Sequence, residues 1–151
     1  MKMFLGLDTS SKAIHGAVLN EKEELVGLHK WGSSKKNSAE RFPDIVKEFS
    51  DEMSKINIVD YAAIEAAIFV QNRKALISLA SIIGATWAIL VLNGIDTALI
   101  HHAEWKKEVL GKGSLKKEDI MSFATEKWGD KFPEQDYADA ACIALWNKRR
   151  F

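Results

Sequence analysis

Residues 4–11 read FLGLDTSS, and this stretch decides how the chain is expected to fold. The apolar run of residues 3–7 ends at Asp8, and a polar turn over residues 9–11 follows it. Short apolar runs bounded by such turns are typical of β-strands. We therefore predict a central strand over residues 3–7 that opens a hairpin and carries an acid at its end.

The rest of the chain continues in an α/β order. Further apolar runs predict strands over residues 14–19, 24–31, 58–64 and 96–100. Apolar spacings of three and four residues predict helices from Ser38, as N-cap, to about residue 56, and over 73–92, 104–110, 115–128 and 136–148. Three antiparallel strands followed by crossover helices predict a five-stranded mixed sheet, three strands antiparallel and then two parallel, flanked by helices. This order resembles the ribonuclease H-like fold.

Length and composition limit the class of protein. The chain has 151 residues, 47% of them hydrophobic, so it can bury a core and is not intrinsically disordered. We expect a single domain over residues 1–151. The 21 basic residues balance 21 acidic ones, and such a balance is unusual for a protein that binds nucleic acid.

The location of the protein is predicted to be cytoplasmic. The single cysteine, Cys142, has no disulfide partner, and no secretory leader pattern opens the chain. Residues 75–95 carry no charge and are numerous enough to span a bilayer. The polar residues among them, and the α/β pattern on both sides, favour a buried or dimer-forming helix instead. We expect the cytoplasm of a bacterial cell, or of an infected host cell if the protein is viral.

Acidic residues fall at the ends of the predicted elements. Asp8 ends the first strand and Glu65 ends the fourth. A right-handed crossover would return the fourth strand parallel to the first, and neighbouring strands lie about 4.8 Å apart. These two acids would then lie side by side. Each acid taken alone is equally compatible with an ordinary polar loop position.

A second pair of acids, Asp136 and Asp139, opens the last predicted helix. Residues three apart share one helix face, although acids at a helix start are also favoured by the helix dipole. The residues that follow are small, which would let this helix approach the sheet closely: Ala138, Ala140, Ala141 and Ala144.

These acids together suit a metal-dependent hydrolase. Clustered carboxylates repel one another unless cations lie between them, and hard oxygen ligands suit Mg²⁺ or Mn²⁺. Two such ions about 3.5 to 4 Å apart are typical of phosphodiester cleavage. With four acids assigned to metal, 17 acidic residues face 21 basic ones, so the balanced charge does not exclude DNA.

The motifs resemble the RuvC family of Holliday-junction resolvases in order along nearly the whole chain. They are residues 4–11 (FLGLDTSS), 63–65 (AIE), 106–117 (KKEVLGKGSLKK) and 136–141 (DYADAA). The resemblance implies a homodimeric endonuclease that nicks opposed strands of four-way DNA junctions with two Mg²⁺ ions, for which Mn²⁺ substitutes. It implies that the catalytic, metal-binding residues are Asp8, Glu65, Asp136 and Asp139.

The same resemblance implies a set of DNA contacts and a dimer interface. The DNA-binding residues would be Lys106, Lys112, Lys117, Phe69, Asn72 and Arg73, and the helix over 73–92 would form the dimer. The family has an aromatic residue just after the second acid, and here Ile68 takes that position, with Phe69 one residue late. Either of these two residues is a candidate for the base-contacting position.

Other functions remain compatible with these residues. A ribonuclease H-like nuclease on RNA/DNA hybrids, or a nuclease on other branched DNA, would use the same acids and metals. A catalytically inactive DNA-binding or scaffold protein would keep the fold without the reaction. An acid followed by Ser or Thr at the end of a first strand also occurs in the actin and sugar-kinase superfamily, where it holds Mg-ATP, but those enzymes use two related domains.

Overall fold

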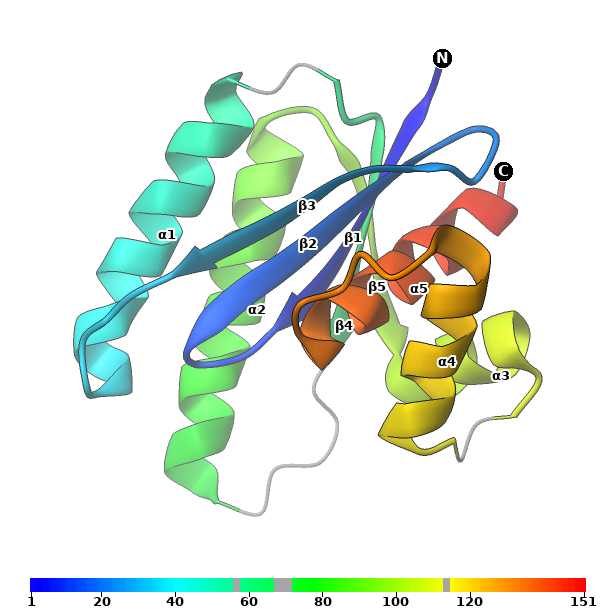
Figure 1. Ribbon diagram of the computed structural model, residues 1–151. Helices are drawn as coiled ribbons and strands as arrows, with labels where there is room; N and C mark the ends of the chain where they lie inside the picture. Colours follow the sequence, from blue (N-terminus) through cyan, green and yellow to red (C-terminus); the bar gives the residue numbers. More distant parts are fainter. Residues whose placement is uncertain (56–57, 67–71, 113–114) are drawn as a thin grey trace.

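The computed structural model shows a mixed sheet with helices on both sides (Figure 1). It describes residues 1–55, 58–66, 72–112 and 115–151. The strands are β1 (Met3–Thr9), β2 (Ala13–Asn20), β3 (Leu25–Gly32), β4 (Tyr61–Ala66) and β5 (Asp96–His101). The helices are α1 (Ser38–Lys55), α2 (Arg73–Leu92), α3 (His102–Leu110), α4 (Lys117–Trp128) and α5 (Gln135–Arg149). The sheet has the strand order β3-β2-β1-β4-β5, with β1 to β3 antiparallel and β1, β4 and β5 parallel. The predicted fold class is therefore confirmed.

Several predicted boundaries differ from the observed ones by one to three residues, and two of the differences have local physical reasons. The strand predicted over residues 58–64 begins at Tyr61, because the Asp60 carboxylate accepts a hydrogen bond from the Met3 backbone N–H at 2.8 Å and fixes the entry into the ladder. Ser38 is not the N-cap of α1. Asn37 is, since its side-chain oxygen accepts from the Glu40 N–H at 2.8 Å. The Ser38 hydroxyl instead contacts the Ser78 hydroxyl of α2 at 3.0 Å.

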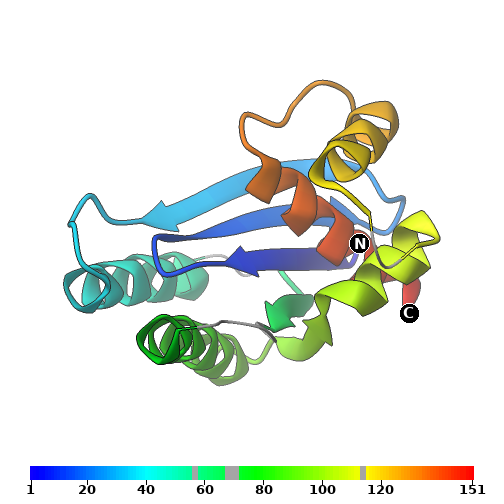
Figure 2. The same ribbon diagram turned by 90° about the horizontal axis from the view of Figure 1, so that it is seen from below.

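The helices divide between the two faces of the sheet (Figure 2). Helices α1 and α2 pack on one face, over a core that includes Leu5, Leu7 and Ile64. Helices α3, α4 and α5 pack on the other, where the core includes Ala63 and Ile100. Side chains alternate along a strand, so Asp8 shares the second face with Gly6, and Glu65 shares it with Ala63.

Helix α5 lies directly on β1, and Gly6 is the point of contact. A β-carbon at Gly6 would overlap the Ala140 carbonyl oxygen and the Ala144 backbone nitrogen, and would lie 2.9 Å from Ala144 Cα. The small residues of α5 face the sheet and are fully buried, which is the close approach that the sequence predicted. This contact holds the start of α5 beside the end of β1.

Helix α2 has one buried face and one apolar exposed face. Ile82, Thr86 and Leu90 are buried. On the opposite side, Ile77 and Val91 are 61% and 57% exposed. By length and composition alone, the helix is apolar enough to cross a membrane. Within the protein, 22% of its most apolar window is buried.

Candidate active site

A row of polar side chains crosses the sheet where β1 and β4 end. Leu7 of β1 pairs with Ile64 of parallel β4, so the next residues, Asp8 and Glu65, are neighbours. On the other side of β1, Asp8 pairs with His15 of β2, and His15 pairs with Lys30 of β3. All four side chains lie on the face that α5 covers. The prediction that Asp8 and Glu65 lie side by side is thus met by the strand register.

The start of α5 adds two more carboxylates above this row. Asp8, Asp136 and Asp139 each offer an oxygen atom, and these three atoms lie within 4.8 Å of one another. Each of the three side chains is partly buried. Oxygen donors at this spacing fit a hard divalent cation such as Mg²⁺ or Mn²⁺. The cluster can therefore hold a divalent metal ion.

Mutual repulsion changes the acidity of the cluster. Burial, followed by the charges of Glu65, Asp139 and Asp136, raises the pKa of Asp8 well above its ordinary value. Burial raises the pKa of Asp139 to about 6, with Glu65 and Asp136 adding to the effect. Carboxylates that resist ionisation together are those that a divalent cation would stabilise most. The donor set thus fits the metal on electrostatic grounds as well as by geometry.

Neighbouring side chains orient two of these acids. The indole Nε1–H of Trp105, which is 1% exposed, donates to Glu65 Oε2 at 2.6 Å. Burial raises the pKa of Glu65, and this hydrogen bond and the charge of Lys106 oppose the rise. The Gln135 amide donates to Asp139 Oδ1 at 3.0 Å. Both contacts bring the carboxylates into fixed positions, and the sequence alone did not reveal either one.

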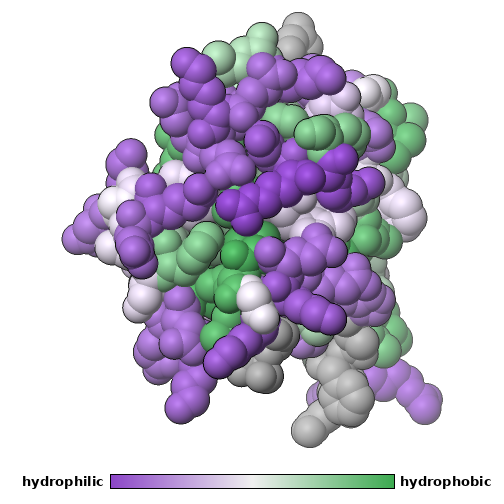
Figure 3. All heavy atoms as spheres, turned by 90° about the vertical axis from the view of Figure 1, so that its right-hand side faces the viewer, coloured by the Kyte–Doolittle hydropathy of each residue, from purple (hydrophilic) through white to green (hydrophobic). Residues whose placement is uncertain are grey.

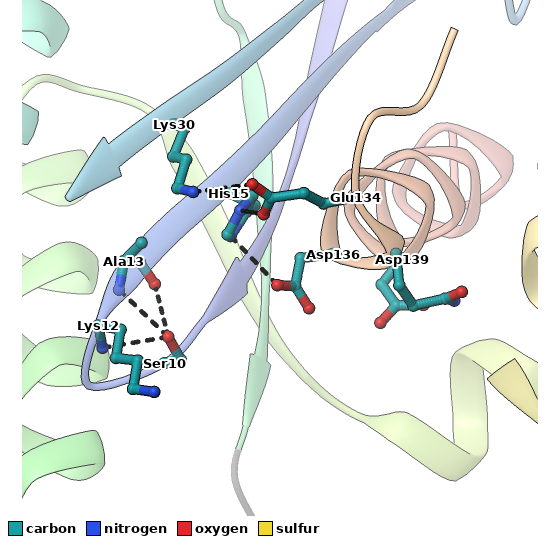
Figure 4. Close-up of polar contacts among 9 residues, drawn as sticks. Ser10, Lys12, Ala13, His15, Lys30, Glu134, Asp136 and Asp139 are labelled. Carbon is teal, nitrogen blue, oxygen red and sulfur yellow. Dashed lines mark hydrogen bonds and ion pairs between the residues drawn. The ribbon is translucent and has the colours of Figure 1, made fainter. Parts of the chain in front are cut away.

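A second polar network adjoins the cluster at the start of α5 (Figure 4). Glu134 accepts hydrogen bonds from Lys30 Nζ and pairs with His15 Nε2, both at 2.9 Å. The other ring nitrogen of His15 faces Asp136 Oδ2 at 3.8 Å. His15 was not predicted as part of the site, although it pairs with Asp8 across the hairpin that follows β1.

The structure places the predicted DNA-binding residues in different environments. Lys106 is partly buried near the carboxylates, and Lys112 and Lys117 are exposed. Asn72 caps α2, accepting from the Lys74 N–H at 2.9 Å, and Arg73 is exposed beside it. Phe69 and Ile68 lie outside the described residues. Hydrophilic side chains cover most of the side that carries α3 and α4 (Figure 3).

A groove of about 770 Å³ separates the start of α2 from α1. Asn72 and Arg73 line it together with Ser11 of the β1–β2 turn and the apolar side chains of Phe42 and Ile77. It lies away from the carboxylate cluster, on the opposite face of the sheet. The groove is therefore separate from the carboxylate cluster.

The mixed sheet with acids at the ends of β1 and β4 and at the start of α5 defines a ribonuclease H-like protein with a candidate metal-dependent nuclease site. Over residues 1–149 the chain matches the family described as "Lactococcus phage M3 protein", and it belongs to that family. It is also 32% identical over 100 residues to the crossover junction endodeoxyribonuclease RuvC of Brachyspira hyodysenteriae. That alignment covers 66% of this chain and 62% of the relative's length.

Solved structures show the same fold. Thermus thermophilus RuvC in complex with a Holliday junction substrate matches with a TM-score of 0.81 at 18% identity, over 96% of this chain and 92% of that one. The yeast mitochondrial Holliday junction resolvase Ydc2 matches with a TM-score of 0.62 at 13% identity, over 96% and 77%. The ribonuclease H-like fold and the resemblance to the RuvC family are thereby confirmed.

Proposed function

We propose that this chain is a structure-selective DNA endonuclease that resolves four-way junctions. The observation that carries the proposal is the carboxylate cluster of Asp8, Asp136 and Asp139, with Glu65 adjacent, at one edge of the sheet. The likeness to RuvC enzymes in sequence and fold supports a junction as the substrate. Residues 1–151 would act as one nuclease domain in the bacterial cytoplasm, which suits a family described from a phage.

The four acids would hold two Mg²⁺ ions, with Mn²⁺ as a substitute. Such ions activate a water molecule for attack on phosphorus and stabilise the leaving 3′ oxygen. The chain's own contribution is to place the oxygen donors before substrate arrives. Trp105 and Gln135 hold Glu65 and Asp139 in position, and Lys106 adds a positive charge near both acids.

DNA would approach across the edge where β1, β4 and α5 present these acids. Exposed Lys117 lines a hollow together with Gln135, the residue that donates to Asp139, and exposed Lys112 follows α3. Exposed Arg73 lines the groove between α1 and α2. Lysine and arginine contacts to phosphates position a duplex without reading its sequence. Binding that depends on junction shape is the expected result.

A homodimer through α2 supplies the second active site that two opposed cuts require. Its exposed face carries residues at alternating three- and four-residue spacings, as in a coiled-coil seam. These residues are Ile77, Ala80, Gly84, Trp87 and Val91. An apolar stripe of this kind on one helix is a typical interface between identical chains. We propose it as the dimer contact.

A cleavage assay on matched substrates tests the proposal. Four-way, three-way, flap and RNA/DNA hybrid substrates are incubated with the protein and Mg²⁺, and the products are mapped on both strands. We expect paired nicks in the four-way junction. The variant Asp8→Asn should lose at least about 100-fold in cleavage rate, since it removes a metal ligand, while still binding the junction.

The matched control is Asp130→Asn, which changes an exposed acid in the turn after α4. It should cut at the wild-type rate. Cleavage of hybrids alone would replace the proposed substrate, and an active Asp8→Asn variant would refute the assignment of the site.

A further inference from the structure

His15 is a buried imidazole that adjoins the carboxylate cluster without belonging to it. It is 4% exposed and lies between Asp8 on β1 and Lys30 on β3 in the register of the sheet. The edge of its ring contacts the Tyr137 ring, with centroids 4.8 Å apart. Burying a polar ring of this kind is costly unless both of its nitrogen atoms have partners. The environment of each nitrogen therefore indicates what the residue does.

The two nitrogens have different surroundings (Figure 4). Nε2 lies 2.9 Å from Glu134 Oε2, and Glu134 is itself held by Lys30 Nζ at 2.9 Å. Nδ1 faces Asp136 Oδ2 at 3.8 Å, a separation too long for a hydrogen bond. With the Nε2 hydrogen donated to Glu134, the lone pair of buried Nδ1 faces an oxygen of Asp136, whose side chain is half exposed.

This arrangement is the one that metal-binding histidines usually have. One ring nitrogen donates its hydrogen to a carboxylate, which fixes the tautomer and turns the lone pair of the other nitrogen toward the metal. Ligand atoms lie about 2.0 to 2.2 Å from a first-row metal ion, so two ligands of one ion are separated by about 3 to 4 Å. His15 Nδ1 and Asp136 Oδ2, 3.8 Å apart, lie within this range.

We propose that His15 Nδ1 and Asp136 bind a divalent transition-metal ion at a nitrogen-containing site beside the carboxylate cluster, with Glu134 and Lys30 as the outer contacts that orient His15. This inference rests on the proposed function only in that Asp136 also belongs to the carboxylate cluster. An imidazole ligand favours transition metals such as Mn²⁺ over Mg²⁺, which prefers oxygen. His15 would therefore give this chain a preference between the two metals.

Electron spin-echo spectroscopy on the DNA-free protein tests the site with Mn²⁺ as the probe. With one equivalent of Mn²⁺ we expect modulation from a directly bound ¹⁴N nucleus, and labelling the histidines with ¹⁵N should change it. The variant His15→Gln should lose the modulation. Its affinity for Mn²⁺ should fall by about 10-fold or more, while its affinity for Mg²⁺ falls by less.

The matched control is His102→Gln, at an exposed position at the start of α3, which should keep the modulation. The ¹⁵N experiment uses the unmodified sequence, so it decides the question even if His15→Gln does not fold. Absence of nitrogen modulation in the wild type, or its persistence in folded His15→Gln, would overturn the proposal. A His15 that only pairs with the two acids gives the first of these results.

Junction cleavage and nitrogen coordination can fail independently. If the protein cuts four-way junctions but shows no nitrogen modulation, only the His15 site is refuted. If modulation depends on His15 but no substrate is cut with any metal, the metal site stands and the proposed function does not.

Discussion

The substitution Gly6→Ala tests whether the contact between β1 and α5 sets the geometry of the carboxylate cluster. The added methyl group would overlap backbone atoms of Ala140 and Ala144, and would lie 2.9 Å from Ala144 Cα. None of these atoms belongs to a flexible side chain. The helix itself must therefore move away from the strand.

The size of the effect follows from this geometry. A β-carbon needs about 3.4 Å or more from backbone atoms, so α5 must retreat by about 1 Å in a core that has no free space. Overpacking of this kind costs about 1–3 kcal/mol of unfolding free energy. Asp136 and Asp139 move with the helix while Asp8 stays on the strand. A misplacement of about 1 Å in a reacting group can lower the rate about 100-fold.

Two measurements check the prediction, and a second glycine provides the control. Urea denaturation followed by circular dichroism gives the unfolding free energy, and single-turnover junction cleavage with Mg²⁺ gives the rate. Gly32→Ala makes the same change on β3, where the new β-carbon meets Ala13 Cβ at an ordinary 3.4 Å. The control should lose little stability or activity. If Gly6→Ala remains as stable and active as the control, then the packing of α5 on β1 does not position the site.

Three further predictions concern the charge, orientation and pairing of the site. In the metal-free protein, the pKa of Asp139 rises from 3.8 to about 6, so the folded state keeps a proton that the unfolded state releases between these values. The unfolding free energy should fall by about 1–2 kcal/mol as pH rises from about 4 to 6, once partial exposure is allowed for. Asp139→Asn should make that fall smaller in thermal denaturation across pH, with the remainder coming from Asp8 and Glu65, and an unchanged pH profile would contradict the reasoning. Trp105→Phe keeps a buried aromatic ring but removes the hydrogen-bond donor to Glu65. We expect the chain to stay folded and the metal concentration for half-maximal cleavage to rise about 10-fold. If instead the metal dependence matches wild type, Glu65 does not need the indole. Ile77→Asp places a charge in the exposed stripe of α2 and should give a monomer by sedimentation, whereas Leu92→Asp at the 85% exposed end of the helix serves as its control. A dimer that survives Ile77→Asp lies elsewhere.

Much of the fold could be predicted because its signals are local. The apolar run before Asp8, the crossover that returns β4 parallel to β1 and the alanines of α5 together require the acids to meet at one edge. Boundaries were harder to predict where neighbouring residues compete for one role. Asn37 and Ser38 are both good N-caps, and only the backbone path decides between them.

The supporting contacts of the site could not be predicted in the same way. Trp105 reaches Glu65 from 40 positions away in the chain, and no local pattern marks an indole as a hydrogen-bond donor to an acid. His15 lies nearer, and hairpin register would have placed it beside Asp8. Its partner Glu134 could not be foreseen, because that contact depends on how the start of α5 meets β2.

The balanced charge of the chain acquires a physical meaning from the site. Burial and mutual repulsion raise the pKa values of Asp8, Glu65 and Asp139, so the folded protein carries electrostatic strain at one edge when no cation is bound. Phosphates approaching that edge would meet the same repulsion. A divalent ion relieves both effects, because it stabilises the ionised carboxylates and changes the sign of the local field. If the proposed function holds, metal binding, folded-state stability and affinity for DNA are coupled through the same side chains. A net charge of zero is consistent with the proposed DNA-binding protein, whose negative charge would be gathered at the proposed metal site.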